Sequence, residues 1–116
     1  MPLQPGTKLG PYEIISVVET RDDSDLYKAS DTRLNREVAV KVFTNRFSDR
    51  FQREARTVAS LNHPHICLLH DIGHQEGMDF IVLEHLEGQT LAERLKRGAL
   101  DLDEALTHAI AIADAL

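Results

Sequence analysis

The stretch EVAVKVF, residues 37–43, is the clearest secondary-structure signal in this sequence of 116 residues. Its run of β-branched side chains predicts a β-strand. Because side chains alternate across a strand, the three valines share one face, and Ala39, Lys41 and Phe43 share the other. Lys41 therefore lies within an apolar strand, where a lysine is costly to bury unless an opposite charge pairs with it.

A helix is predicted after this strand, over residues 49–61, and it carries a matching charge. At about 100° per residue its apolar side chains form one arc, and Glu54 falls inside that arc. The members of the arc are Phe51, Ala55, Val58 and Leu61. Two interpretations are open: both charged groups extend to solvent, or Lys41 and Glu54 form an ion pair between strand and helix. We favour the ion pair because the two charges lie on consecutive elements.

The remaining elements complete an α+β pattern. Further strands are predicted at 12–18, 26–30, 67–72 and 78–83. Beyond Glu84 the pattern becomes helical. Thr90 with Glu93, and Asp101 with Glu104, form two capping boxes, which predict a short helix and a long final helix. We expect a five-stranded sheet with one helix, followed by two more helices. The apolar stripe of the last helix runs to Leu116, so we also expect that helix to continue and its apolar face to be covered.

Composition narrows the classes of function. The net charge of −6 makes a nucleic-acid or anionic-membrane partner unexpected. No apolar run approaches the roughly 20 residues that a membrane span needs, and no secretory signal is visible at the N-terminus. The single cysteine, Cys67, fits a reducing compartment, so a cytoplasmic location is expected.

Several histidines cluster in the middle of the chain and raise the alternative of a metal-binding adaptor. The candidates are His63, His65, Cys67, His70 and His74. Their spacing matches no usual zinc-ligand pattern. No metal site is therefore expected.

Three long segments together resemble protein kinases. EVAVKVF resembles the strand that carries the nucleotide-binding lysine, RFQREARTVASLNHPHI (50–66) the single helix of the N-lobe, and DFIVLEHLEGQTLAERL (79–95) the fifth strand, hinge and first C-lobe helix. LGPYEI (9–14) and YKASDTRLNREVAVK (27–41) are similar to bacterial serine/threonine kinases.

The resemblance implies a kinase N-lobe, with a five-stranded antiparallel sheet and one helix, over residues 1–83. A hinge over 84–88 and the incomplete start of a C-lobe over 89–116, with its first two helices, would follow. The implied function is that of a serine/threonine protein kinase-like fragment containing the ATP-binding lobe.

Roles for individual residues also follow from the resemblance. In such kinases the strand lysine holds the α- and β-phosphates of ATP and the helix glutamate orients that lysine; these roles fall on Lys41 and Glu54. Leu83 matches the gatekeeper position. The adenine would lie between Val18, Leu26 and Ala39, with the hinge backbone of Glu84 and Leu86 at its edge.

The phosphate-covering loop departs from the family pattern. The motif G-x-G-x-x-G falls on Glu19, Arg21 and Ser24, so all three glycines are replaced. Glycine lets backbone amides approach the phosphates, and a Cβ hinders that approach. Arg21 would offset part of the negative charge of four nearby acids, which are Glu19, Asp22, Asp23 and Asp25. In a second interpretation the loop folds outward and its acids are solvated. Either way, we expect ATP affinity to be weak or lost.

The second departure concerns catalysis. The 116 residues contain neither a His-Arg-Asp catalytic loop nor an Asp-Phe-Gly metal-binding motif, which supply the base and the magnesium ligands in the family. Magnesium use is thus implied only for an intact family member, and this chain is expected to be inactive alone. The alternative is a pseudokinase-type protein-interaction module, with a protein partner or self-association through the final helix.

Overall fold

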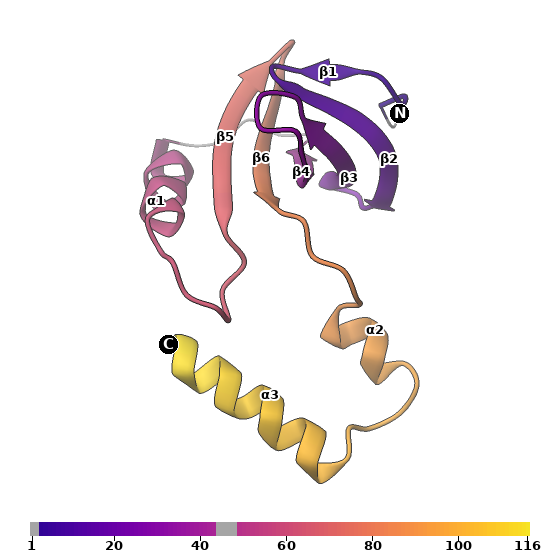
Figure 1. Cartoon of the computed structure of the whole chain (residues 1–116), viewed down its shortest axis with the longest axis vertical. Coiled ribbons are helices and arrows are strands. Elements are labelled where there is room, and N and C mark those ends of the chain that lie inside the picture. The colour runs from indigo at the N-terminus through magenta and orange to yellow at the C-terminus, as the bar shows by residue number, and fades with distance from the viewer. Residues whose placement is uncertain (1–2, 44–48) are drawn as a thin grey trace.

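The computed structural model describes residues 3–43 and 49–116 and shows a curled antiparallel sheet with one helix at its edge and two helices below it (Figure 1). The strands are β1 (Lys8–Leu9), β2 (Tyr12–Thr20), β3 (Ser24–Asp31), β4 (Arg36–Phe43), β5 (Leu69–Gln75) and β6 (Met78–Glu84). The helices are α1 (Asp49–Ala59), α2 (Leu91–Leu95) and α3 (Leu102–Ala115).

The sheet has six strands in the order β1-β2-β3-β4-β6-β5. The α+β class is confirmed, whereas the expected number of five strands was too low by one. The additional strand is β1, which pairs Lys8 with Glu13 and Leu9 with Tyr12. Two residues are too few to show the alternating pattern that reveals a strand in sequence.

The core lies on the valine face of β4. Val38 and Val40 are fully buried, and Val42 is nearly so. They pack in one cluster with Tyr27, Val82 and other residues of the neighbouring strands. The alternation predicted for EVAVKVF is therefore confirmed, because Ala39, Lys41 and Phe43 on the opposite face are only half-buried.

Helix α1 packs against β5 at one edge of the sheet (Figure 1). The apolar arc of this helix is only partly buried among its described side chains. Ala55 is buried, but Val58 is 42% exposed and Leu61 45% exposed, and Glu54 is exposed as well. A helix that rests on an edge strand buries a narrow stripe, so the flanks of a wide arc stay in solvent. The side chain of Phe51 lies outside the described part of the chain.

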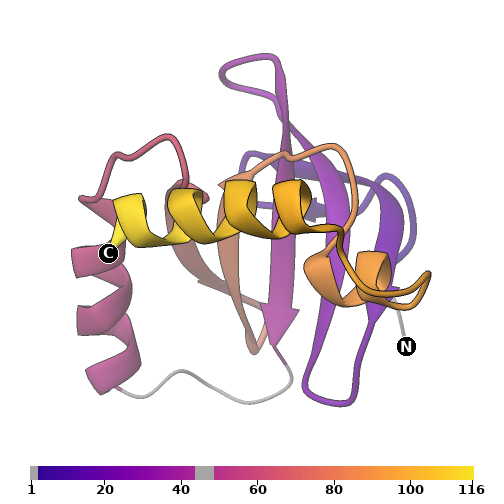
Figure 2. The same cartoon turned by 90° about the horizontal axis from the view of Figure 1, so that it is seen from below.

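The two predicted helix caps are present. The Thr90 hydroxyl accepts a hydrogen bond from the Glu93 amide at 3.1 Å, and the Asp101 carboxylate accepts one from the Glu104 amide at 2.8 Å. Viewed from below, α3 crosses beneath the sheet towards α1 (Figure 2). Within the described residues, no helix is long and apolar enough to cross a membrane.

Candidate functional site

Side chains from four strands and one loop surround a small pocket on the face of the sheet opposite the core. The pocket has a volume of about 200 Å³ and is lined by Glu19, Arg21, Ser24, Leu26, Lys41 and Leu83. Strand register explains this convergence: Leu26 lies opposite both Glu19 and Lys41, and Leu83 lies opposite Ala39. Residues directly opposite in a sheet share a face.

Lys41 is the basic group that β4 brings to this pocket. Its ammonium nitrogen lies 5.4 Å from the centroid of the Phe43 ring, two residues along the same face. A cation at that distance is attracted by the electron-rich face of the ring. Glu54 is exposed on α1 and is not among the described residues that line the pocket. The ion pair between Lys41 and Glu54 stays a prediction.

The loop between β2 and β3 closes as a tight hairpin. The Arg21 amide donates a hydrogen bond to the Ser24 carbonyl at 2.8 Å, and the buried Ser24 hydroxyl donates to Asp23 at 3.3 Å. In the described residues, positive φ angles outside glycine occur at Asn35 and Glu76. The hairpin therefore turns without the left-handed backbone that favours glycine.

The acids of this loop do not all face the pocket. Glu19 lines it, and its carboxylate is 2.8 Å from Arg21 Nε. Asp25 accepts a 3.4 Å hydrogen bond from the Tyr27 hydroxyl. Asp22 and Asp23 are exposed at the tip of the hairpin. The predicted negative charge next to a ligand thus reduces, among the described residues, to the single carboxylate of Glu19.

The predicted adenine-contacting residues are only partly brought together. Leu26 and Leu83 line the pocket and Ala39 lies directly opposite Leu83, but Val18 and Leu86 are each 60% exposed. The Glu84 amide donates to the Leu68 carbonyl at 2.9 Å, while the Glu84 carboxylate accepts from the Leu68 amide at 2.8 Å. The Glu84 carbonyl also accepts from the Cys67 thiol at 4.0 Å, so a ligand would have to use the second lone pair of that oxygen.

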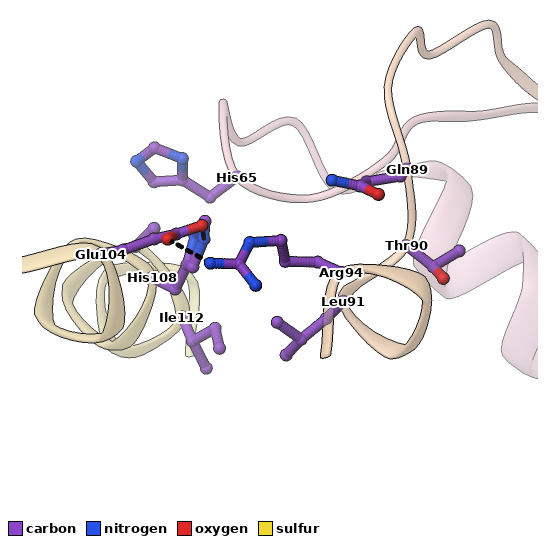
Figure 3. Close-up of a pocket in the computed structure, with 9 residues that line it drawn as sticks. His65, Gln89, Thr90, Leu91, Arg94, Glu104, His108 and Ile112 are labelled. Atoms are coloured by element: carbon purple, nitrogen blue, oxygen red, sulfur yellow. Dashed lines mark hydrogen bonds and ion pairs between the residues drawn. The ribbon is translucent and has the colours of Figure 1, made fainter. Parts of the chain in front are cut away.

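A larger pocket, of about 430 Å³, lies between α2 and α3 (Figure 3). Arg94 crosses it to reach the Glu104 carboxylate at 3.0 Å, and the same guanidinium donates to the Gly98 carbonyl. His108 lies 3.8 Å from Glu104. From the sequence, Glu104 was predicted only as a capping residue, since contacts between separate helices leave no local pattern.

The histidines serve as contacts between elements. His63 Nε2 lies 3.4 Å from the Asp114 carboxylate on α3, and His65 Nε2 lies 3.9 Å from it. His63 Nδ1 accepts a hydrogen bond from the His65 amide, so the proton of the neutral ring is on Nε2. No cluster of three His, Cys, Asp or Glu able to hold a metal occurs among residues 3–43 and 49–116.

The pKa values of two side chains in this part of the chain, His70 and Cys67, differ from their ordinary values. Burial lowers the pKa of His70, and the positive charge of Arg36 acts in the same direction. The Cys67 side chain is exposed overall, but the desolvation that remains at its thiol raises the thiol pKa, and the negative charge of Glu84 acts in the same direction. At neutral pH the thiol is therefore held in its less reactive protonated form.

Comparison with known proteins agrees with this geometry. The family model described as protein tyrosine and serine/threonine kinase matches residues 7–116. The chain belongs to the protein kinase family. This kinase chain is 36% identical over 115 residues to the serine/threonine-protein kinase PrkC of Bacillus subtilis, an alignment that covers 88% of the chain and 18% of PrkC. It is 40% identical over 112 residues to PknA of Mycobacterium tuberculosis, covering 86% of the chain and 26% of PknA.

Solved structures show the same architecture. The kinase domain of PknI from Mycobacterium tuberculosis superposes with a TM-score of 0.87 at 25% sequence identity, covering 98% of this kinase chain and 50% of that domain. The resemblance to a kinase N-lobe is therefore confirmed. The division into lobe, hinge and C-lobe at residues 84 and 89, and the roles of the individual site residues, stay predictions.

Proposed function

We propose that this chain is the nucleotide-binding part of a serine/threonine protein kinase domain and that it binds ATP weakly. The observation that carries the proposal is the pocket in which Lys41 lies with Leu26 and Leu83. Two apolar side chains can hold the flat face of a purine, while an ammonium group can hold its phosphates. Use of ATP also fits a cytoplasmic protein, and the exposed, unpaired Cys67 fits that compartment.

The roles of the other residues follow from this assignment. Ala39 borders the adenine next to Leu83, and the carbonyl of Glu84 accepts a hydrogen bond from its edge. Val18 and Leu86, both largely exposed, close over the base when the ligand is present. Glu54 orients Lys41 if α1 moves inward on binding. Intact kinases use ATP with magnesium; the carboxylates that hold the metal there have no counterpart in these 116 residues.

A thermal-shift titration with Mg-ATP tests the proposal. Because a ligand that binds only the folded state stabilises it by mass action, the melting temperature of the wild type is expected to rise with ATP concentration. Lys41→Ala is expected to lose most of that rise. Lys96→Ala, which changes an exposed lysine at the end of α2, is the matched control. An equal rise in wild type and Lys41→Ala would refute the assignment of Lys41.

Catalysis by these residues alone is not expected. Phosphoryl transfer depends on a positioned base and metal ions, and the sequence contains neither His-Arg-Asp nor Asp-Phe-Gly. We expect no phosphate transfer from radiolabelled ATP to a generic basic protein above the level of a Lys41→Ala control. Turnover that depends on Lys41 would contradict this.

A second candidate function is a pseudokinase-type interaction module. It is favoured by the exposed apolar side chains of α3, which include Leu102, Leu106, Ile110 and Ile112. In such a module this face would bind a protein partner or a second copy of this chain. Binding of a purified kinase C-lobe fragment by the wild type, but not by Ile110→Glu, would instead favour the first proposal.

A further inference from the structure

We propose that Arg21 is a phosphate-contacting residue, and that its guanidinium replaces the backbone amides with which a glycine-rich loop would hold a nucleotide. The inference rests on the proposed function, since it needs a nucleotide in the Lys41 pocket. The inference explains how a loop that lacks the glycines could still contact the phosphates.

Two polar groups of this loop are already bonded within the protein. The Arg21 amide donates to the Ser24 carbonyl, and the Ser24 hydroxyl donates to Asp23. Neither group is directed to a ligand in this structure. A side chain of the loop can supply the phosphate contact that these two groups do not make.

Arg21 is the side chain of the loop that suits this purpose. It lines the same pocket as Lys41, although 62% of its side chain is exposed. Glu19 holds it through Nε at 2.8 Å. A guanidinium has five N–H donors, so an Nε contact leaves the terminal NH₂ groups for a bidentate contact with phosphate oxygens.

Charge indicates the class of ligand. The described pocket-lining residues include two cations, Arg21 and Lys41, and one anion, Glu19. Leu26 lies in register between Glu19 and Lys41, so an apolar side chain lies beside the charged groups of the pocket. A nucleoside di- or triphosphate presents a flat apolar base and several negative oxygens, and it matches both features. A nucleoside without phosphate would use the apolar part alone.

Isothermal titration calorimetry with ADP and with adenosine tests this assignment. Arg21→Gln is expected to weaken ADP about tenfold, the effect of losing one charge-assisted hydrogen bond, and to leave adenosine unchanged. Arg21→Lys should retain part of the ADP affinity, because lysine keeps the positive charge but cannot make the bidentate contact of a guanidinium. Arg97→Gln, the same substitution at an exposed residue just after α2, is the matched control and should change neither ligand.

The outcomes separate the inference from the proposed function. If adenosine and ADP both bind and Arg21→Gln keeps their affinity ratio, Arg21 does not contact phosphate and the inference fails alone. If Arg21→Gln weakens both ligands equally, its role is structural and the inference fails as well. If the wild type binds neither ligand, the proposed function fails and the inference with it. Selective loss of ADP affinity with the control unchanged supports both.

Discussion

At the scale of single residues, the pocket combines side chains that attract phosphate with one that repels it. Lys41 and Arg21 provide positive charge, while Glu19 is the carboxylate that the described lining contains. The negative charge of Glu19 is partly offset by the 2.8 Å contact of its carboxylate with Arg21. The positive and negative charges of the pocket differ by only one, so removing a single charge should change the affinity for a nucleotide.

Glu19→Gln is expected to raise the affinity for ADP. The amide keeps an oxygen that can accept from Arg21 Nε, so the guanidinium stays in place while a negative charge leaves the pocket. Relief of about 1 kcal/mol of like-charge repulsion corresponds to a gain of about fivefold. Calorimetry measures the change, and Asp22→Asn, at the exposed tip of the same hairpin, is the control. A lower affinity in Glu19→Gln would show that Glu19 acts through position rather than charge.

At the scale of elements, side-chain hydrogen bonds join strands that are not neighbours in the sheet. Tyr12, on β2, donates its hydroxyl proton to Asp71, on β5, at 2.7 Å, and accepts from Arg33 at 3.1 Å. Its ring also meets Phe80 edge to face, with centroids 6.3 Å apart. Burial, the hydrogen bond to Asp71 and the charge of Asp71 raise the pKa of Tyr12 to about 12. The Tyr12 phenol thus helps to close the curled sheet, together with Gln75 of β5, which donates to the Lys8 carbonyl and accepts from the Gly10 amide.

The raised pKa gives a prediction for stability at alkaline pH. The fold favours the protonated phenol, so its contribution is complete below the ordinary pKa of 10.0 and is lost as the pH rises towards 12. Tyr12→Phe is expected to lower the free energy of unfolding by about 1 kcal/mol at neutral pH and to make the decline above pH 10 shallower. Urea unfolding at a series of pH values measures both.

A control is needed because burial raises the pKa of Tyr27 as well. Tyr27→Phe removes a hydroxyl that contacts Leu3 and Asp25, not β5. The loss of stability above pH 10 should change in both variants. In double-mutant cycles with Asp71→Asn, a coupling free energy should appear for Tyr12→Phe and not for Tyr27→Phe. Equal coupling for both tyrosines would contradict the proposed link between β2 and β5.

Local patterns predicted the elements well and their surroundings poorly. Alternation identified the valine face of β4, and capping boxes located α2 and α3, because both signals arise within one element. The exposure of Val58 on α1 could not be read in this way. A helical moment gives the direction of an apolar face but not the width of the surface that covers it. Glu54, which lies within the same arc, is exposed for the same reason.

The sequence predicted some residues of the pocket but not how the loop beside them is built. Lys41 was found because a charge inside an apolar strand is conspicuous. The hairpin of Arg21 and Ser24 was read from the family pattern as a place where glycines are missing. The structure shows what replaces them, namely a turn that needs no positive φ and an arginine held by Glu19. Such a substitution depends on the register of β2 with β3, which composition does not specify.

At the scale of the whole molecule, polar contacts join α3 to the other described residues, and no residue of α3 is fully buried. Asp114 approaches His63 and His65 in the segment between α1 and β5, and Glu104 approaches Arg94. Meanwhile the apolar side chains Leu102, Leu106 and Ile110 are exposed. Exposed apolar surface of this kind usually marks an interface. The 116-residue chain should therefore associate with itself when no other polypeptide covers α3.

Sedimentation velocity over a range of protein concentrations tests this expectation. The wild type is expected to shift from monomer towards dimer as concentration rises, because burial of two or three leucine-sized side chains per chain contributes several kcal/mol, at about 1.5–3 kcal/mol each. Leu106→Glu with Ile110→Glu should keep the chain monomeric, since it would place two charges in that interface. Thr107→Glu adds one charge on the same helix beside these residues and serves as the control for charge alone. A wild type that stays monomeric throughout would show that the polar contacts of Asp114 and Glu104 suffice to hold α3, and that its apolar side chains tolerate water without a partner.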